Sequence, residues 1–226
     1  MKSVVYGGTR NIYQHMIPAI NSVLQNGGID KVYVLAEDDW FPHPDVEVIN
    51  VRDHPFKDSP NAHKRWSYII LMKACLPYLI PLDKVLWLDY DTIVERDISG
   101  LWDIDMTDYY FAGVREPRKS AGGDWYRQPL YINAGVLMCN LEKLRDGKAD
   151  EIIKALQEKE YSYPEQDCIN ELCQGHILKI GGRYNYSDFT EYDTDAVIYH
   201  FATYEPNDLA WQLKAKPYMG DRHGKL

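Results

Sequence analysis

The sequence predicts an α/β protein with a mostly parallel central sheet that is flanked by helices. Short apolar runs typical of buried strands alternate along the chain with longer stretches of helical periodicity. One run, residues 85–88, is continuously apolar and ends abruptly in two acids, Asp89 and Asp91. Such a run is typical of a strand that is covered on both faces, as in a parallel sheet. With 45% hydrophobic and 26% charged residues, the 226-residue chain is long enough to bury a sizeable core in one large domain.

The N-terminal segment predicts a strand, a helix and a second strand in close succession. Residues 2–6 form the first strand, and Gly7, Gly8 and Thr9 follow it directly. Glycines at that point let a ligand approach the backbone closely, and Tyr13 is near enough in the chain to contact the same ligand. The helix at 15–26 stops at a Gly-Gly pair, and the next strand covers 32–36. This order opens a nucleotide-binding βαβ unit, although neither GxGxxG nor a P-loop is present.

The remaining elements follow from the same patterns. Residues 37–62 predict a surface loop around a short strand at 46–51, and a solvated loop is favoured over a phosphate contact for His54, His63, Lys64 and Arg65. Residues 116–129 predict a loop that could close over a ligand. The other predicted elements are helices at 66–79, 141–159 and 164–173, and strands at 110–114, 131–141 and 197–201.

Asp89 and Asp91 stand where ligands of open α/β sheets bind, outside the carboxyl end of a strand. Two carboxylates with one residue between them can offer oxygens to one divalent cation, while a third group and a phosphorylated ligand complete its coordination. A polar strand end that caps the next turn explains the two acids equally well. Lys73, on the predicted helix 66–79, can face the pair, but it can also be an ordinary surface lysine.

Polar residues at three later positions are also candidates. Asn133, at the entry of the strand 131–141, offers an amide donor and an amide acceptor, which suits a sugar hydroxyl. Glu165 and Asp167 can cap a helix, a role that does not explain Gln166 between them. His200 lies near the end of the last strand, where a lone histidine is more often packed in the core than bound to a metal.

Composition excludes some classes of protein. The net charge of −9 argues against a nucleic-acid partner. Four scattered cysteines show no CxxC motif and no histidine at zinc spacing, so we expect reduced thiols. Neither a signal peptide nor a run of about 18 apolar residues is visible, so no transmembrane segment is predicted and a cytoplasmic location is expected. Eighteen tyrosines and six tryptophans hint weakly at carbohydrate.

Four segments together carry a resemblance to a known family. They are Leu-Trp-Leu-Asp-Tyr-Asp-Thr at 86–92, Tyr-Ile-Asn-Ala-Gly-Val-Leu at 131–137, Glu-Gln-Asp-Cys-Ile-Asn at 165–170 and Ile-Tyr-His-Phe at 198–201. In this order and spacing they resemble glycosyltransferase family 8, the group of glycogenin and the bacterial lipooligosaccharide galactosyltransferases, over about residues 3–218.

The resemblance implies a single GT-A (Rossmann-like) domain over residues 1–226, with 1–100 mainly binding the nucleotide and 101–218 the sugar and the acceptor. It implies a retaining hexosyltransferase that takes its sugar from a UDP-sugar donor and uses Mn²⁺ or Mg²⁺. A glycan, a lipid-linked sugar or a protein could each be the acceptor. The oligomeric state does not follow from it.

Carried over to this sequence, the family pattern implies a role for each of several residues. The metal ligands would be Asp89, Asp91 and His200. The nucleotide and diphosphate contacts would be Gly7, Gly8, Thr9, Asn11, Tyr13, Lys73, Tyr90 and Lys216. The donor sugar and its reactive face would be lined by Asn133 and Gln166, with Glu165 and Asp167 beside them.

The chain also departs from the family pattern. Glu165 replaces the more usual Asp, and Lys73 replaces an arginine, which keeps the charge but loses the bidentate fork for phosphate. Lys216-Pro217-Tyr218 stands in for a Lys-Pro-Trp sequence.

Two alternative functions remain. One is a phosphatase of the haloacid dehalogenase type, in which a Thr or Val follows the Asp-x-Asp motif one residue later than Thr92 does here. The other is a non-catalytic or self-glycosylating protein that binds a nucleotide sugar.

Overall fold

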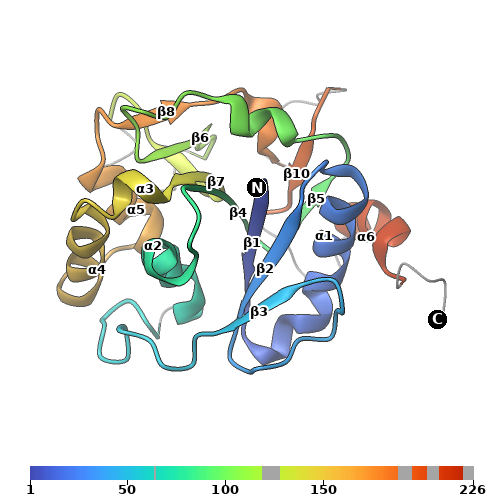
Figure 1. The fold of residues 1–226 in the computed structure, drawn as a ribbon, viewed down its shortest axis with the longest axis horizontal. Coiled ribbons are helices and arrows are strands. Elements are labelled where there is room, and N and C mark those ends of the chain that lie inside the picture. Colours follow the sequence, from blue (N-terminus) through green and yellow to red (C-terminus); the bar gives the residue numbers. More distant parts are fainter. Residues whose placement is uncertain (64, 119–127, 188–194, 203–208, 221–226) are drawn as a thin grey trace.

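The fold is an α/β arrangement around a seven-stranded, mostly parallel sheet in the described part of the chain (Figure 1), which confirms the predicted fold class. The computed structural model describes residues 1–63, 65–118, 128–187, 195–202 and 209–220. Among the described strands of this sheet, β7 is antiparallel to both of its neighbours, and all other pairs are parallel. The strand order is β3 (Glu47–Asn50), β2 (Lys31–Ala36), β1 (Ser3–Gly7), β4 (Lys84–Leu88), β7 (Ile132–Asn140), β6 (Phe111–Arg115) and β8 (Ile177–Lys179).

Strand β4 shows why its sequence is continuously apolar. Val85 and Trp87 belong to the hydrophobic core on one face of the sheet, and Leu86 and Leu88 belong to the core on the other face. All four side chains are buried. A strand at the centre of a sheet that is covered on both sides has no solvent face, so polar residues are confined to its ends. The two acids therefore stand at the first position where the chain can leave the core.

Helices cover both faces of the sheet (Figure 1). Residues from η1 (Arg10–Ile12), α1 (Tyr13–Asn26) and η3 (Ser99–Asp103) pack in one core cluster. Residues of the opposite core cluster come from η2 (Tyr68–Cys75), α2 (Leu76–Leu79), α3 (Leu141–Leu144), α4 (Lys148–Glu158) and α5 (Pro164–Leu172).

A second, three-stranded sheet was not predicted. It consists of β5 (Thr92–Val94), β10 (Ile198–His200) and β9 (Tyr186–Ser187), and β9 follows the turn η5 (Gly182–Tyr184). Antiparallel pairing of β10 with β5 sets His200 opposite Thr92. The predicted strand at 197–201 is thus confirmed, and it reaches the acid pair through this small sheet. Two further unpredicted elements, α6 (Leu209–Ala215) and η6 (Lys216–Tyr218), follow it.

Two stretches were each predicted to form one continuous helix, and the structure divides both of them. Residues 66–79 form the 3₁₀ stretch η2 followed by the short α2, which has Pro77 in its first turn. Proline is favoured in the first turn of a helix, where its missing N–H would have no partner within the helix, so Pro77 marks a new start. The predicted helix 141–159 is divided into α3 and α4 by Gly147, whose φ of 95° lies in the left-handed region.

The helices and the cysteines bear on two other expectations from composition. None of the helices in the described ranges is both long and apolar enough to cross a membrane. All four cysteines, which lie within the described residues, are buried and free.

Replacing Gly147 with alanine tests the helix break. The added Cβ would meet no neighbouring atom within 4 Å, so the cost is confined to the left-handed backbone. We expect G147A to lower the free energy of unfolding by ~1–2 kcal/mol in urea denaturation. The control is G100A, because Gly100 lies in η3 without a positive φ and its Cβ would also meet nothing. Equal stabilities of the two variants would contradict the assigned break.

Candidate active site

A cavity of about 440 Å³ opens where β1 and β4 end. It contains most of the residues that the sequence singled out. The predicted site residues that line it are Gly7, Thr9, Asn11, Asp89, Tyr90, Asp91, Asn133, Glu165, Gln166 and His200. Residues in its lining that were not predicted include Trp66, Trp87, Arg118, Gly135 and Tyr163. The structure thus brings together the ends of two strands, the start of α5 and the end of β10.

Asp89, Asp91 and His200 form a cluster in which one ligand atom from each lies within 4.8 Å of the others. Asp89 is anchored by its backbone N–H, which donates to the Gly135 carbonyl at 2.8 Å, and by the Trp87 indole, which donates to its Oδ1 at 2.7 Å. His200 is placed by the backbone, because the N–H of Phe201 donates to the Asp91 carbonyl at 2.9 Å. The pairing of β5 with β10 therefore assembles the cluster.

The donor set of this cluster fits a divalent cation. Oδ1 of Asp91 is buried, and among the described residues it has no hydrogen bond beyond its 3.3 Å contact with Nε2 of His200. A buried carboxylate oxygen in that condition is unfavourable unless a cation or water satisfies it. Two carboxylates and one imidazole suit Mn²⁺, and Mg²⁺ accepts the same carboxylates.

The histidine of the cluster is electrostatically coupled to both acids. Its Nε2 lies 3.3 Å from Oδ1 of Asp91. Burial by itself lowers the pKa of His200, but the nearby carboxylates of Asp91 and Asp89 outweigh burial, so the pKa is raised. A cation at this position would replace the proton that the two acids attract.

Because Gly135 has no side chain, the Asp89–Asp91–His200 cluster has room beside it. A Cβ on Gly135 would overlap Cε1 of His200 and would lie 2.8 Å from its Nε2 and 2.9 Å from Oδ2 of Asp89. The missing side chain of Gly135 thus admits two of the candidate metal ligands.

Lys73 lies beneath the cavity and is fully buried. Its ammonium donates to Oε1 of Glu165 at 2.8 Å and to the Ala134 carbonyl at 2.9 Å, and it lies 3.2 Å from Oδ1 of Asp89. Burial by itself lowers the pKa of Lys73, but Asp89 and Glu165 outweigh it and the pKa is raised. Burial by itself raises the pKa of Asp89, but Lys73, His200 and the Trp87 indole outweigh it and hold the pKa below its usual value. Lys73 does face the acids as expected, as part of a buried ionic cluster.

The predicted sugar-side residues belong to a buried polar network. Gln166 accepts a hydrogen bond from the Ala134 N–H at 2.9 Å, and its amide donates to the Tyr131 hydroxyl at 3.1 Å and to Glu116 at 3.3 Å. Asn133 donates to the same carboxylate of Glu116 at 2.8 Å. Sequence reasoning missed Glu116 and Tyr131 because a single acid after a strand and a tyrosine within one carry no distinctive pattern.

Asp167 is also part of this network, but it is not among the cavity-lining residues. It accepts hydrogen bonds from the Tyr131 hydroxyl at 2.6 Å and from the Tyr163 N–H at 2.8 Å. Burial raises the pKa of Asp167, and these two hydrogen bonds oppose that shift. Its carboxylate therefore ties the start of α5 to the entry of β7, which agrees with the capping alternative.

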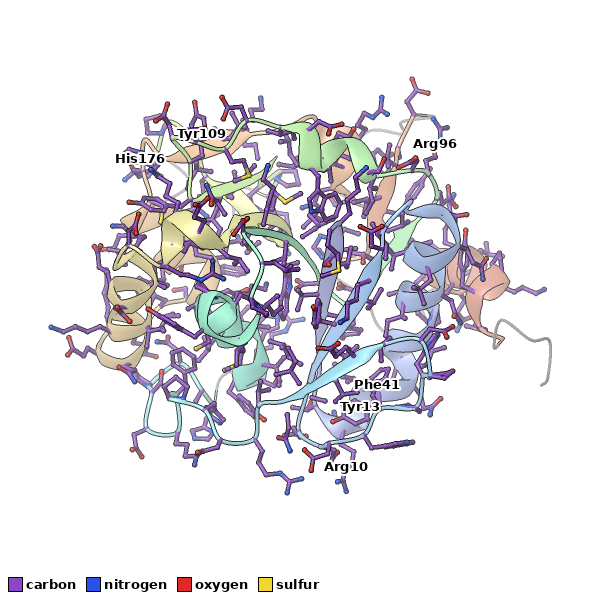
Figure 2. All side chains as sticks on the ribbon, viewed as in Figure 1. Arg10, Tyr13, Phe41, Arg96, Tyr109 and His176 are labelled. Carbon is purple, nitrogen blue, oxygen red and sulfur yellow. The ribbon has the colours of Figure 1, made fainter. Side chains whose placement is uncertain are left out.

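The segment after β1 is divided between cavity and core. Gly7, Thr9 and Asn11 line the cavity, whereas Gly8 packs so that a Cβ there would overlap Met16 Sδ. Tyr13 is buried, and its hydroxyl donates to Asp38 at 3.2 Å and accepts from the Glu37 N–H at 2.9 Å. Figure 2 shows its ring beside Phe41, with Arg10 at the same edge of the molecule.

Lys216 is not brought to the cavity in the described part of the chain. It is exposed on η6, which packs against α1 through hydrogen bonds from Asn21 to the Tyr218 and Gly220 carbonyls. A diphosphate contact by Lys216 therefore stays a prediction.

The residues weighed for a phosphate contact at 54–65 are divided in the same way. Arg65 lines the cavity, whereas the ring of His54 stacks on Tyr68. Residue 64 lies outside the described residues, as do residues 119–127 and 203–208.

This chain is similar to several known proteins. The model of the family described as glycosyl transferase family 8 matches residues 4–205. Glycosyltransferase GlyD of Streptococcus pneumoniae is 25% identical over 97% of this chain and 32% of its own length. Lipopolysaccharide 1,2-glucosyltransferase of Escherichia coli is 32% identical over 47% of this chain and 34% of its own length. The chain thus spans about a third of the length of these curated relatives.

Solved structures show the same fold. The galactosyltransferase LgtC in complex with donor and acceptor sugar analogues superposes with a TM-score of 0.73 at 20% identity, covering 96% of each chain. Glycosyltransferase GlyE of Streptococcus pneumoniae gives a TM-score of 0.71 at 18% identity and covers 95% of this chain and 61% of its own. These neighbours establish the GT-A fold.

Replacing Gly135 with alanine tests the geometry of the cluster. The new methyl group must displace His200 or Asp89, so we expect G135A to weaken Mn²⁺ binding about 10-fold or more in titration calorimetry. The control is G182A, since a Cβ on Gly182 would meet nothing within 4 Å. Unchanged Mn²⁺ affinity in G135A, with the fold intact by circular dichroism, would show that these three side chains are not the ligands.

Proposed function

The chain belongs to glycosyl transferase family 8, and from this membership we propose that it moves a hexose from a UDP-sugar to an acceptor hydroxyl, with retention at the anomeric carbon and with a divalent cation. The observation that carries the proposal is the Asp89–Asp91–His200 cluster in a cavity that Asn133 and Gln166 also line. The cluster suits a cation-bound diphosphate, and the two amides suit a sugar beside it.

The cluster would bind the donor through its diphosphate. A cation held by Asp89, Asp91 and His200 would neutralise the negative charge that develops on the diphosphate as the sugar leaves. Thr9 and Asn11, which line the cavity after β1, would contact the nucleoside. Lys73 would act from beneath, because its ammonium orients Asp89 and Glu165. Lys216 would have to approach from η6 to contribute a further charge.

Gln166 would stabilise the reacting sugar rather than attack it. Its amide oxygen is neutral, and that oxygen already accepts a hydrogen bond from the Ala134 N–H. Both properties make a covalent bond to the anomeric carbon unfavourable. The acceptor oxygen would instead form its bond on the face from which the diphosphate leaves. The acceptor proton would pass to the diphosphate oxygen that the broken bond releases, so no protein base is required.

An aromatic rim favours a carbohydrate acceptor. Trp66 and Tyr163 both line the cavity with ring centroids 5.4 Å apart, and the Arg65 guanidinium lies 5.7 Å from the Trp66 ring. Tyr163 stands three residues before Gln166, so this rim adjoins the sugar side of the cavity. Aromatic faces bind the apolar faces of sugar rings, which a small alcohol lacks. A glycan is therefore the acceptor class that this rim supports.

The alternatives account for less of the site. A haloacid-dehalogenase-type phosphatase does not explain His200 or the Asn133–Gln166 pair. A non-catalytic or self-glycosylating protein remains a second candidate, and consumption of donor with and without added acceptor separates it from the main proposal. A cytoplasmic location remains a proposal, which the four free thiols support because such thiols persist in reducing compartments.

Donor binding is the first test of this function. Titration calorimetry with UDP, UDP-glucose, UDP-galactose and UDP-N-acetylglucosamine is expected to show binding with Mn²⁺ that EDTA abolishes, since the diphosphate meets the protein through the cation. Preference among the sugars would identify the donor. D91A is expected to abolish binding, and the exposed control D103A to leave it unchanged. Full transfer by D91A, or binding that persists in EDTA, would refute the metal assignment.

Replacing Trp66 with alanine tests the acceptor side. Loss of one aromatic face, worth about 1–1.5 kcal/mol, is expected to raise the acceptor KM about 10-fold while the donor KM stays constant. The control is W40A, because Trp40 is exposed and is not among the cavity-lining residues. A W66A variant that loses donor affinity instead would place Trp66 on the nucleotide side.

A further inference from the structure

Four buried side chains form a continuous chain of hydrogen bonds from a carboxylate to a candidate metal ligand. Asn133 donates to Oε2 of Glu116 at 2.8 Å, Asn185 donates to Oδ1 of Asn133 at 2.9 Å, and Nδ1 of His200 lies 2.9 Å from Oδ1 of Asn185. The exposed fractions of the four residues are 0%, 6%, 5% and 4% from Glu116 to His200. Because water has little access, each polar atom depends on its neighbour in this chain.

Glu116 defines the direction of the chain because an ionised carboxylate can only accept. Arg118 donates to both of its oxygens, through Nε at 2.9 Å and through a terminal nitrogen at 3.0 Å. Burial alone raises the pKa of Glu116, but the hydrogen bonds from Arg118 and Asn133 outweigh it and the pKa is lowered. The ionised carboxylate therefore requires Asn133 to present its NH₂ group.

A backbone group independently confirms the orientation of Asn133. The N–H of Gly135 donates to Oδ1 of Asn133 at 2.9 Å, and an N–H group can only donate. With its NH₂ toward Glu116 and its oxygen toward Gly135, Asn133 can only accept from Asn185. Asn185 must then turn its own oxygen toward His200. The last bond is consequently a donation from Nδ1–H of the imidazole to Asn185.

We infer that Glu116, acting through Asn133 and Asn185, determines that Nδ1 of His200 keeps its proton and that Nε2 is the nitrogen offered to the cation. Nε2 is the ring nitrogen that lies 3.3 Å from Asp91 and whose approach the missing Cβ of Gly135 permits. When a cation binds, Nε2 gives up any proton it carries to solvent, and Nδ1–H stays on Asn185. Glu116 and Asn185 are thus positioning residues, and the inference rests on the metal site of the proposed function.

The opposite tautomer of His200, with the proton on Nε2, would be energetically unfavourable in this buried site. If Nδ1 lost its proton, its lone pair would face the oxygen of Asn185, and the Nε2–H group would point into the cluster. Turning the amides to compensate would place the NH₂ of Asn133 against the N–H of Gly135. Groups that orient a metal-binding imidazole in this way typically change metal affinity by about 10–100-fold when they are removed.

The first experiment measures Mn²⁺ affinity by titration calorimetry or electron paramagnetic resonance, without donor or acceptor. The amide introduced by E116Q is isosteric with the carboxylate of Glu116, but its NH₂ must face either the donors of Arg118 or those of Asn133 and Gln166. E116Q is therefore expected to bind Mn²⁺ about 10-fold more weakly. The control is E95Q, which breaks the ion pair of Glu95 with Lys214 outside this chain of bonds and is expected to bind Mn²⁺ normally. A normal affinity in E116Q would overturn the inference.

A second variant bypasses Glu116. In N185D an acceptor-only carboxylate meets Nδ1–H of His200 directly, so the tautomer no longer depends on Glu116, although the donation from Asn185 to Oδ1 of Asn133 is lost. We expect N185D to keep the Nδ1–H tautomer, and E116Q to have no further effect on Mn²⁺ affinity in the N185D background. A purely structural role of Glu116 would make E116Q equally harmful in both backgrounds, and that outcome would refute the inference.

A third readout needs no metal. Long-range ¹H–¹⁵N spectra, recorded at a pH where the imidazole is neutral and assigned with an H200Q variant, distinguish the two tautomers. At that pH we expect the Nδ1–H tautomer of His200 in the wild type and in N185D, and a mixture of the Nδ1–H and Nε2–H tautomers in E116Q. A wild-type protein with Nε2–H would refute the inference. If the wild type binds no Mn²⁺, the metal site of the proposed function fails, and these spectra still decide the inference.

Discussion

The buried ammonium of Lys73 holds together the three segments that form the floor of the cavity. It joins the end of β4 through Asp89, the start of α5 through Glu165 and the entry of β7 through the Ala134 carbonyl. Two carboxylates this close would repel each other without a cation between them, and removing one partner of a buried ion pair typically costs about 3–5 kcal/mol. The position of Asp89, the first candidate metal ligand, therefore depends on a residue that does not itself line the cavity.

The antiparallel strand β7 connects this ionic floor to the rest of the site. Asn133 bonds Glu116 and Asn185, Ala134 bonds Lys73 and Gln166, and Gly135 bonds Asp89 and leaves room for His200. Three consecutive residues thus contact the candidate metal ligands, the amide of Gln166 and the buried lysine. Successive side chains of a strand point to opposite faces of the sheet, so neighbouring residues of β7 reach different partners. The backbone groups between them bond to further residues.

Prediction from the sequence succeeded where a signal is local. The apolar run 85–88 indicates a strand, the glycines after residue 6 the end of one, and the Glu-Gln-Asp segment the start of a helix, each within a few residues. It failed for β5, β8 and β9, which are two or three residues long and owe their geometry to partner strands. It also failed at Gly147, where a positive φ divides a stretch whose periodicity alone suggests one helix.

The sequence by itself determined the α/β class, the acid pair at a strand end, the family and most of the residues in the cavity. Only the tertiary structure decided that Lys73 is a buried support, that Gly135 makes room for Asp89 and His200, and that Asn185 and Glu116 follow His200 in a chain of hydrogen bonds. The physical reason is that these contacts join residues far apart in the chain, such as Asn133 and Asn185 at a separation of 52. Strand pairing decides which such residues meet, and no local pattern records it.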